Sequence, residues 1–315
     1  MKKSVLLILF LLLIFFSACQ KDTNVVTYSD DDPIILNMGN DVIKILQITD
    51  LHLTFGFDAN DRKTFSLIEK LVKSDDFDLV VISGDMTLSI TAPNLFSMLV
   101  KHMESLETPW TFVFGNHESD FHGYHRFIDQ LSNTEYLQFK VGPELVDGGY
   151  GNFIIQFEKD GQPFYRIYLL DSKAERSDYT EEEGIYDYLS EAQVTWYEQH
   201  VSLDVDDSIV FMHIPLRQFI DPIDYIGIFD EDQVYAQGVD TGFFDVMVTY
   251  GKTKGVFVGH DHLNDFYVIK EGIYLAYGRI SGYNAYGNLE RGGRVIEIDS
   301  EAVMTSYVLL ESEVD

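Results

Sequence analysis

Short apolar runs rich in β-branched and aromatic residues recur along the chain, and each is followed directly by a glycine or a polar residue. Runs of this length with such boundaries are typical of buried β-strands. The clearest runs cover residues 42–48, 77–82, 110–114, 209–212 and 256–258. We predict a strand at each of these positions.

Amphipathic segments between these runs predict helices. Residues 60–73 carry apolar side chains at helical spacing and two lysines in the last turn. Ser190, followed three residues later by Gln193, is a capping-box start for a second helix. Strands that alternate with helices indicate an α/β fold. The C-terminal third instead predicts consecutive antiparallel strands, at residues 266–276, 294–298 and 303–309.

The composition fits one large domain. The chain has 315 residues, of which 46% are hydrophobic, and no break in the pattern demands a second domain. Its formal net charge of −30 at pH 7 creates a field that repels nucleic acid, so we expect no nucleic-acid binding. The same field disfavours an anionic substrate unless the site is locally positive, which two divalent cations would achieve. The sequence identifies no protein partner.

The N-terminus has the features of a bacterial lipoprotein signal. Lys2 and Lys3 precede an apolar run over residues 5–16, and Ser17-Ala18-Cys19 follows it. The run is shorter than the roughly 20 apolar residues that span a membrane. Ordinary signal cleavage, an uncleaved anchor and lipidation at Cys19 are the alternatives, and the segment resembles a lipobox, with Phe16 in place of the usual Leu.

We therefore predict three regions. Residues 1–18 would be a lipoprotein signal peptide, residues 19–40 an acylated Cys19 with a polar tether, and residues 41–311 the folded domain. This organisation predicts an extracytoplasmic membrane lipoprotein of a bacterium, facing the cell surface or the periplasm. The single cysteine leaves no disulfide to stabilise the fold.

Five polar segments follow the predicted strands, in the order Asp50-Leu51-His52, Gly84-Asp85, Gly115-Asn116-His117-Glu118, His213 and Gly259-His260-Asp261-His262. Open α/β sheets place ligand sites at the carboxyl ends of their strands. Carboxylate, imidazole and amide oxygen groups are the ligands that Mn, Fe and Zn ions take in proteins. A short motif alone is weak evidence, but five in this context predict one site with two metal ions.

At these residues the chain resembles the calcineurin-like metallophosphoesterases, whose pattern is Asp-x-His, Gly-Asp, Gly-Asn-His-Asp/Glu, a later His and Gly-His-x-His. The resemblance covers residues 42–309 and is greatest to the branch with the yeast Dcr2 phosphatase and the plant purple-acid-phosphatase 28/29-like proteins. It implies a four-layer α/β/β/α sandwich. Purple acid phosphatases proper have a Tyr ligand where this chain has Leu88 and a Gly where it has His52, so divalent ions are expected here.

The resemblance also implies roles for individual residues. One metal would be held by Asp50, His52, Asp85 and His262, and the other by Asp85, Asn116, His213 and His260. Asp85 would then bridge two divalent ions of the Mn, Fe or Zn type. His117 would sit over the phosphate and either protonate the leaving oxygen or stabilise its charge. Glu118 could orient His117, or it could be a salt-bridged surface residue.

The sequence gives its weakest signal for the residues that contact the substrate. Besides Asn116 and His117, we favour Arg279, because it lies in a loop with glycines and three tyrosines over residues 277–286. The predicted reaction is phosphoester hydrolysis by a hydroxide activated by two metals, with Asp85 and His117 as catalytic residues and phosphomonoesters as substrates. The alternatives are a phosphodiesterase or nucleotidase of the same fold, or a catalytically silent surface lipoprotein.

Overall fold

The computed structural model describes residues 26–204 and 206–314. The predicted signal peptide and Cys19 lie outside the described residues. Within the described part of the chain, no helix has the length and apolar character needed to cross a membrane.

Two mixed β-sheets form the centre of the molecule. One sheet has the strand order β1-β5-β6-β7-β8-β10-β9, and the other has the order β12-β11-β2-β3-β4. The strands of the first are β1 (Ile34–Asn37), β5 (Phe153–Lys159), β6 (Gln162–Leu169), β7 (Asp207–Phe211), β8 (Thr253–Val258), β9 (Tyr267–Lys270) and β10 (Ile273–Tyr277). Those of the second are β2 (Ile43–Ile48), β3 (Leu79–Ser83), β4 (Trp110–Val113), β11 (Gly292–Ile298) and β12 (Met304–Leu310).

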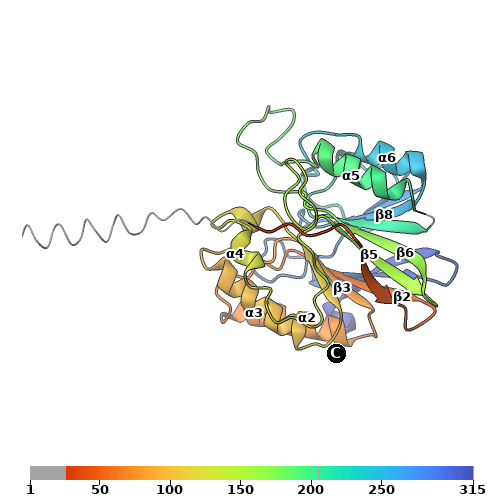
Figure 1. The fold of residues 1–315 in the computed structure, drawn as a ribbon. Coiled ribbons are helices and arrows are strands. Elements are labelled where there is room, and N and C mark those ends of the chain that lie inside the picture. The colour runs from red at the N-terminus through yellow and green to blue at the C-terminus, as the bar shows by residue number, and fades with distance from the viewer. Residues whose placement is uncertain (1–25, 205, 315) are drawn as a thin grey trace, which may run out of the picture.

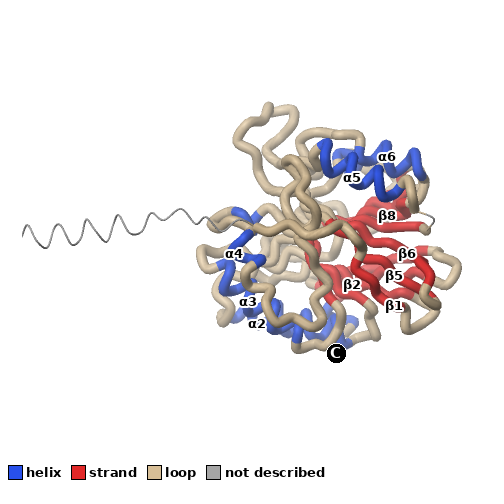
Figure 2. Tube along the Cα trace, in the orientation of Figure 1, coloured by secondary structure: helices blue, strands red, loops and turns tan. Residues whose placement is uncertain are grey.

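Helices cover the outer faces of both sheets (Figures 1 and 2). On the five-stranded sheet lie α2 (Ala59–Lys73), α3 (Ala92–Glu104) and α4 (His125–Ile128), and on the seven-stranded sheet lie α5 (Glu191–Val201) and α6 (Phe243–Tyr250). The described chain also contains the short 3₁₀ helices η1 (His117–Ser119), η2 (Arg217–Phe219) and η3 (Glu311–Glu313). The capping box predicted at Ser190 and Gln193 is present, and the helix predicted over residues 60–73 is α2.

The central strands, such as β2, β3 and β7, are buried on both faces because their apolar residues point alternately to two cores. In β2, Ile45 faces the core between the sheets while Leu46 faces the helices. In β7, Ile209 and Val210 divide in the same way. The predicted four-layer α/β/β/α sandwich is confirmed, and the five predicted strands correspond to β2, β3, β4, β7 and β8.

The antiparallel strands predicted for the C-terminal third are present, but they form two hairpins that belong to different sheets. Residues 266–276 form the hairpin of β9 and β10, which joins the seven-stranded sheet through parallel pairing of β10 with β8. The next hairpin, of β11 and β12, lies in the other sheet beside β2. The alternation of apolar and polar residues predicts each strand, but it does not show to which of the two sheets the strand belongs.

The predicted tether also needs correction. Residues 34–37 form β1, which pairs in parallel with β5 at the edge of the seven-stranded sheet. Before it, the ring of Tyr28 stacks on Tyr150 with 5.6 Å between ring centroids, and Ser29 and Gly142 exchange hydrogen bonds. Within the described part of this segment, residues 28–29 and 34–37 are therefore packed on the domain.

Candidate metal centre

The strand order brings the five polar segments to one edge, where the carboxyl ends of β2, β3 and β4 meet those of β7 and β8. Asp50 and His52 follow β2, Asp85 follows β3, and Asn116 follows β4. His213 follows β7, and the histidines of the last segment follow β8. All the predicted ligands are at least nine-tenths buried, and their functional atoms converge.

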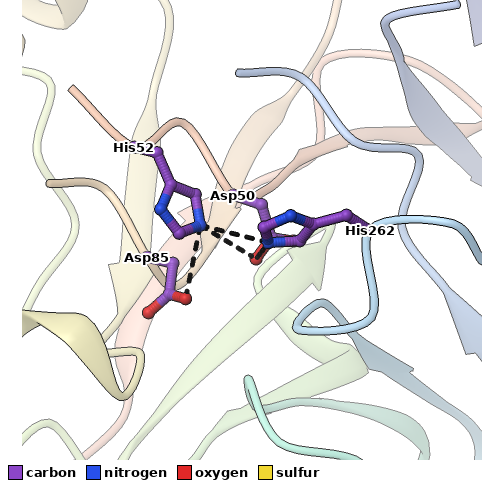
Figure 3. Close-up of side chains that lie close together, drawn as sticks. All are labelled: Asp50, His52, Asp85 and His262. Atoms are coloured by element: carbon purple, nitrogen blue, oxygen red, sulfur yellow. Dashed lines mark hydrogen bonds and ion pairs between the residues drawn. The ribbon is translucent and has the colours of Figure 1, made fainter. Parts of the chain in front are cut away.

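The first cluster consists of Asp50, His52, Asp85 and His262, which point toward one another (Figure 3). Their ligand atoms all lie within 4.8 Å of one another. The Nε2 atoms of His52 and His262 are 3.1 Å apart, and Oδ1 of Asp50 lies 3.3 Å from His262 Nε2. Two imidazoles and two carboxylates converging on one buried point form the donor set of a divalent transition metal.

The second cluster consists of Asp85, His213 and His260, with Asn116 beside them. His213 Nε2 lies 3.2 Å from Asp85 Oδ2 and 3.1 Å from Asn116 Oδ1. Nδ1 of His213 donates to the backbone carbonyl of Ser83 at 2.8 Å, which leaves Nε2 free to face the cluster. The Nε2 atom of His260 is buried and has no hydrogen-bond partner among the described residues, as expected of a nitrogen that takes a metal.

Asp85 connects the two clusters. Its Oδ2 atom lies 3.5 Å from His52 Nε2 as well as 3.2 Å from His213 Nε2, while its Oδ1 atom accepts the backbone N–H of His117 at 3.0 Å. One carboxylate oxygen thus faces ligands of both clusters. This is the position that a carboxylate shared by two cations requires.

The backbone at these strand ends adopts a conformation that non-glycine residues seldom take. Asp50, His52, Asp85 and His260 have φ angles of 54°, 46°, 50° and 80°. Such residues cost about 1–3 kcal/mol each and persist where the surrounding structure holds them, often at functional sites. Gly84 has a φ of 95°, and a Cβ there would overlap the ring of His213, so the Gly-Asp pair allows two segments to approach closely.

The charges of the site also fit bound cations. Burial opposes protonation of His213, but Asp85 and Asp50 outweigh it and raise the pKa of His213 to about 10. Burial, together with the charge on His213, lowers the pKa of His260 to about 3. The two buried carboxylates thus demand compensating positive charge, which one histidine provides by holding a proton. Bound divalent cations would replace that proton, because metal ligands must be deprotonated.

His117 lies beside the clusters rather than within them. Its Nε2 atom is 3.9 Å from Asp85 Oδ2, and its Nδ1 atom is 2.7 Å from Asp120 Oδ2. Burial disfavours the charged ring, but Asp85 and Asp120 outweigh burial and raise the pKa of His117. The sequence did not single out Asp120, although its position three residues after His117 on η1 places the two side chains on one face.

Glu118 has neither of the roles predicted for it. Its side chain is buried and accepts backbone N–H groups of Gly115 at 2.7 Å, Thr87 at 3.1 Å and Asp85 at 3.2 Å. Burial and the charge of Asp85 raise the pKa of Glu118 to about 7. Glu118 therefore joins the loop after β3 to the loop after β4 and fixes the backbone that carries the shared ligand.

The clusters open into a cavity of about 360 Å³. Its lining residues are His52, Asp85, Leu88, Asn116, His117, Glu175, Tyr186, Tyr235, His260, Asp261, His262, Asn284, Ala285 and Tyr286. Tyr186, Tyr235 and Glu175 come from loops without a motif, so sequence patterns gave no signal for them. Of the tyrosines in residues 277–286, Tyr286 lines the cavity, whereas Tyr277 is fully buried.

Arg279, the predicted substrate contact, does not line this cavity. Its side chain is buried, and its guanidinium pairs with Asp265 and donates to the carbonyl of Glu290 at 2.7 Å. The prediction that Arg279 contacts the substrate is therefore corrected. Its guanidinium group makes its ion pair and its hydrogen bonds with other residues of the protein. Asn116 and His117 do line the cavity.

Comparisons with known proteins agree with this geometry. The chain is 30% identical to a protein of Arabidopsis thaliana named probable inactive purple acid phosphatase 14, over 84% of this chain and 76% of that protein. It is 28% identical to probable inactive purple acid phosphatase 29 of the same plant, over 82% and 77%.

Among solved structures, a dimetal phosphatase from Danio rerio has the same fold, with a TM-score of 0.61 and 13% identity over 88% of this chain and 98% of that one. The purple acid phosphatase PPD1 from yellow lupin gives a TM-score of 0.52 and 13% identity, over 87% of this chain and 52% of that one. The family model for calcineurin-like phosphoesterases matches residues 43–264, which include all five polar segments. The chain therefore belongs to the calcineurin-like phosphoesterase family.

Proposed function

We propose that the protein is a metal-dependent phosphatase that hydrolyses small or surface-exposed phosphomonoesters. The observation that carries the proposal is the position of Asp85 Oδ2 between His52 and His213, with the ring of His117 3.9 Å away. Two ligand clusters, a shared carboxylate and an acid at the cavity thus occur together. The plant relatives bear the word inactive in their names, but the ligand set of this chain is complete.

Each residue has a task in this reaction. Asp50, His52 and His262 would hold one cation, Asn116, His213 and His260 the other, and Asp85 both. Two such cations supply Lewis acidity at phosphorus and lower the pKa of an attacking water. His117, with Nδ1 held by Asp120, keeps Nε2 directed at the cavity, where a protonated ring can donate to the leaving oxygen.

The test is a substrate panel on the purified protein after removal of metal and reloading with Mn²⁺, Fe²⁺ or Zn²⁺. We expect p-nitrophenyl phosphate to be hydrolysed faster than bis(p-nitrophenyl) phosphate, and no turnover without metal. The reverse preference would identify a phosphodiesterase or nucleotidase of the same fold. Two bound metals per chain with no turnover of either ester would identify a silent binding protein.

We also propose that the protein works at a membrane surface outside the cytoplasm, anchored through lipid on Cys19. The support is the lipobox-like Ser17-Ala18-Cys19 after a short apolar run. In the native host, Cys19→Ala should abolish retention in the membrane fraction or block processing. An unmodified Cys19 on the mature chain, measured by mass spectrometry, would exclude the lipid anchor.

A further inference from the structure

Apart from His117, the cavity beside the metal clusters is lined by no side chain among the described residues that could carry a positive charge, once the assigned ligands are set aside. None of the described residues that line it is Lys or Arg. Apart from the assigned ligands, its charged lining residues are His117, Glu175 and Asp261. Asp261 is buried and occupied, because it accepts from the hydroxyl of Tyr277 at 2.6 Å and from the backbone N–H of Tyr235 at 3.2 Å.

Glu175 is different from Asp261. It is exposed at the cavity, and among the described residues its carboxylate has no hydrogen-bond or ion-pair partner. It is thus a negative charge available to whatever part of the substrate extends beyond the phosphate. A second anionic group on that part would be repelled by Glu175, and the described lining has no lysine or arginine to offset that repulsion.

Three tyrosines are also part of the lining. Tyr286 lies beside the first metal cluster, Tyr186 lies beside the second, and Tyr235 packs against Tyr186. The ring of Tyr286 lies 4.1 Å from that of His262, and the ring of Tyr186 lies 4.3 Å from that of His260, measured between centroids. Tyr235 stands nearly perpendicular to Tyr186, with 6.4 Å between centroids. Aromatic rings therefore flank the cavity beside both metal clusters.

The hydroxyls of two of these rings are bound to carboxylates on their outer side. Tyr235 donates to Asp232 at 2.9 Å, and Tyr286 donates to Glu231. These bonds fix the rings, and a carboxylate acceptor increases the electron density that a ring presents to a cation. Aromatic rings combined with a free carboxylate are the groups that bind organic ammonium ions. The net charge of −30 would also draw a cationic group toward the protein.

We infer that the preferred substrate carries an organic ammonium group on the alcohol side of its phosphoester, held by Glu175 and the tyrosines Tyr186, Tyr235 and Tyr286. The inference rests on the proposed function and adds the class of leaving group. Choline phosphate represents this class. Its neutral counterpart of the same shape is 3,3-dimethylbutyl phosphate, in which carbon replaces the quaternary nitrogen.

The experiment compares kcat/KM for these two esters in the metal-loaded protein. We expect choline phosphate to be preferred by about tenfold, the size of a cation–π and charge contribution of this kind. Glu175→Gln should reduce this ratio, whereas Glu182→Gln, an exposed acid of the neighbouring loop, should not. Tyr286→Leu should reduce the ratio more than Tyr286→Phe, because only the phenylalanine keeps the ring, although it loses the hydrogen bond to Glu231.

The outcomes separate the two proposals. Hydrolysis of p-nitrophenyl phosphate with a choline-to-dimethylbutyl ratio near one would overturn the ammonium inference and leave the phosphatase proposal intact. The same holds for a ratio that is high but unchanged in both Glu175→Gln and Tyr286→Leu. Absence of turnover on every monoester, at full metal occupancy, would overturn both.

Discussion

Nδ1 of His117 lies 2.7 Å from Oδ2 of Asp120, and this contact determines which ring nitrogen faces the cavity. Because the Asp120 carboxylate stabilises the protonated ring, it also raises the pKa of His117. An acid must hold its proton to act, so activity should fall as the pH rises through that pKa. Asp120→Asn removes the charge and lowers the pKa. We therefore expect the basic limb of the kcat/KM profile to move to lower pH.

The control for this prediction is Asp129→Asn, which removes an exposed carboxylate from the end of α4. Its pH profile should match that of the native protein. If Asp120→Asn instead reduces kcat/KM by the same factor at every pH, the carboxylate acts only by positioning the ring of His117.

His117→Asn tests the role of the acid itself. A poor leaving group needs a proton, whereas the phenolate of p-nitrophenyl phosphate leaves without one. Turnover of alkyl phosphates should fall by roughly 10²–10⁴-fold, and that of p-nitrophenyl phosphate much less. The metal content should stay unchanged, since the ring lies outside both ligand clusters. Equal losses on both ester classes would instead indicate phosphate positioning or stabilisation of charge in the transition state.

Metal content distinguishes the shared carboxylate from an unshared one. Asp85 belongs to both clusters, whereas Asp50 belongs to one. Asp85→Ala should therefore lose both ions, and Asp50→Ala should lose chiefly one, with the greater loss of turnover in Asp85→Ala. Elemental analysis after dialysis measures the ions per chain. Equal losses in the two variants, with the fold retained by circular dichroism, would contradict a bridging role.

The sequence was sufficient to predict which side chains converge in the two clusters because the information for them is local. Each ligand type stands directly after an apolar run, and the run itself predicts the strand whose end carries the ligand. Gly84 and Asp85 illustrate this, since the glycine that permits close approach is adjacent to the residue that it positions. Within each sheet the order of the strands was not needed, because the carboxyl ends of its parallel strands lie at one edge. The packing of the two sheets then brings the two edges together.

Features that depend on distant partners were missed or misassigned. Residues 34–37 look like part of a tether until β5, more than a hundred residues later, provides the strand on which they pair. Glu118 looks like an exposed acid until backbone N–H groups of the loop after β3 converge on it. The apolar run Ile34-Ile35-Leu36 is short and lies in a polar stretch, and Glu118 is a charged residue in a loop, so only the tertiary contacts show why these residues are fixed.

Arg279 is the clearest such case and gives the last prediction. Its guanidinium pairs with Asp265, and both side chains are nearly excluded from solvent. Removing one partner of a buried ion pair leaves an uncompensated charge, which costs about 3–5 kcal/mol. Arg279→Gln should therefore lower the free energy of unfolding by about that amount, while KM for a monoester stays close to the native value. Chemical denaturation and steady-state kinetics on the same preparation provide both numbers, with the exposed Arg62→Gln as the control that should change neither. A rise in KM with native stability would return Arg279 to the substrate site, because a residue that only supports the fold cannot weaken substrate binding without weakening the fold.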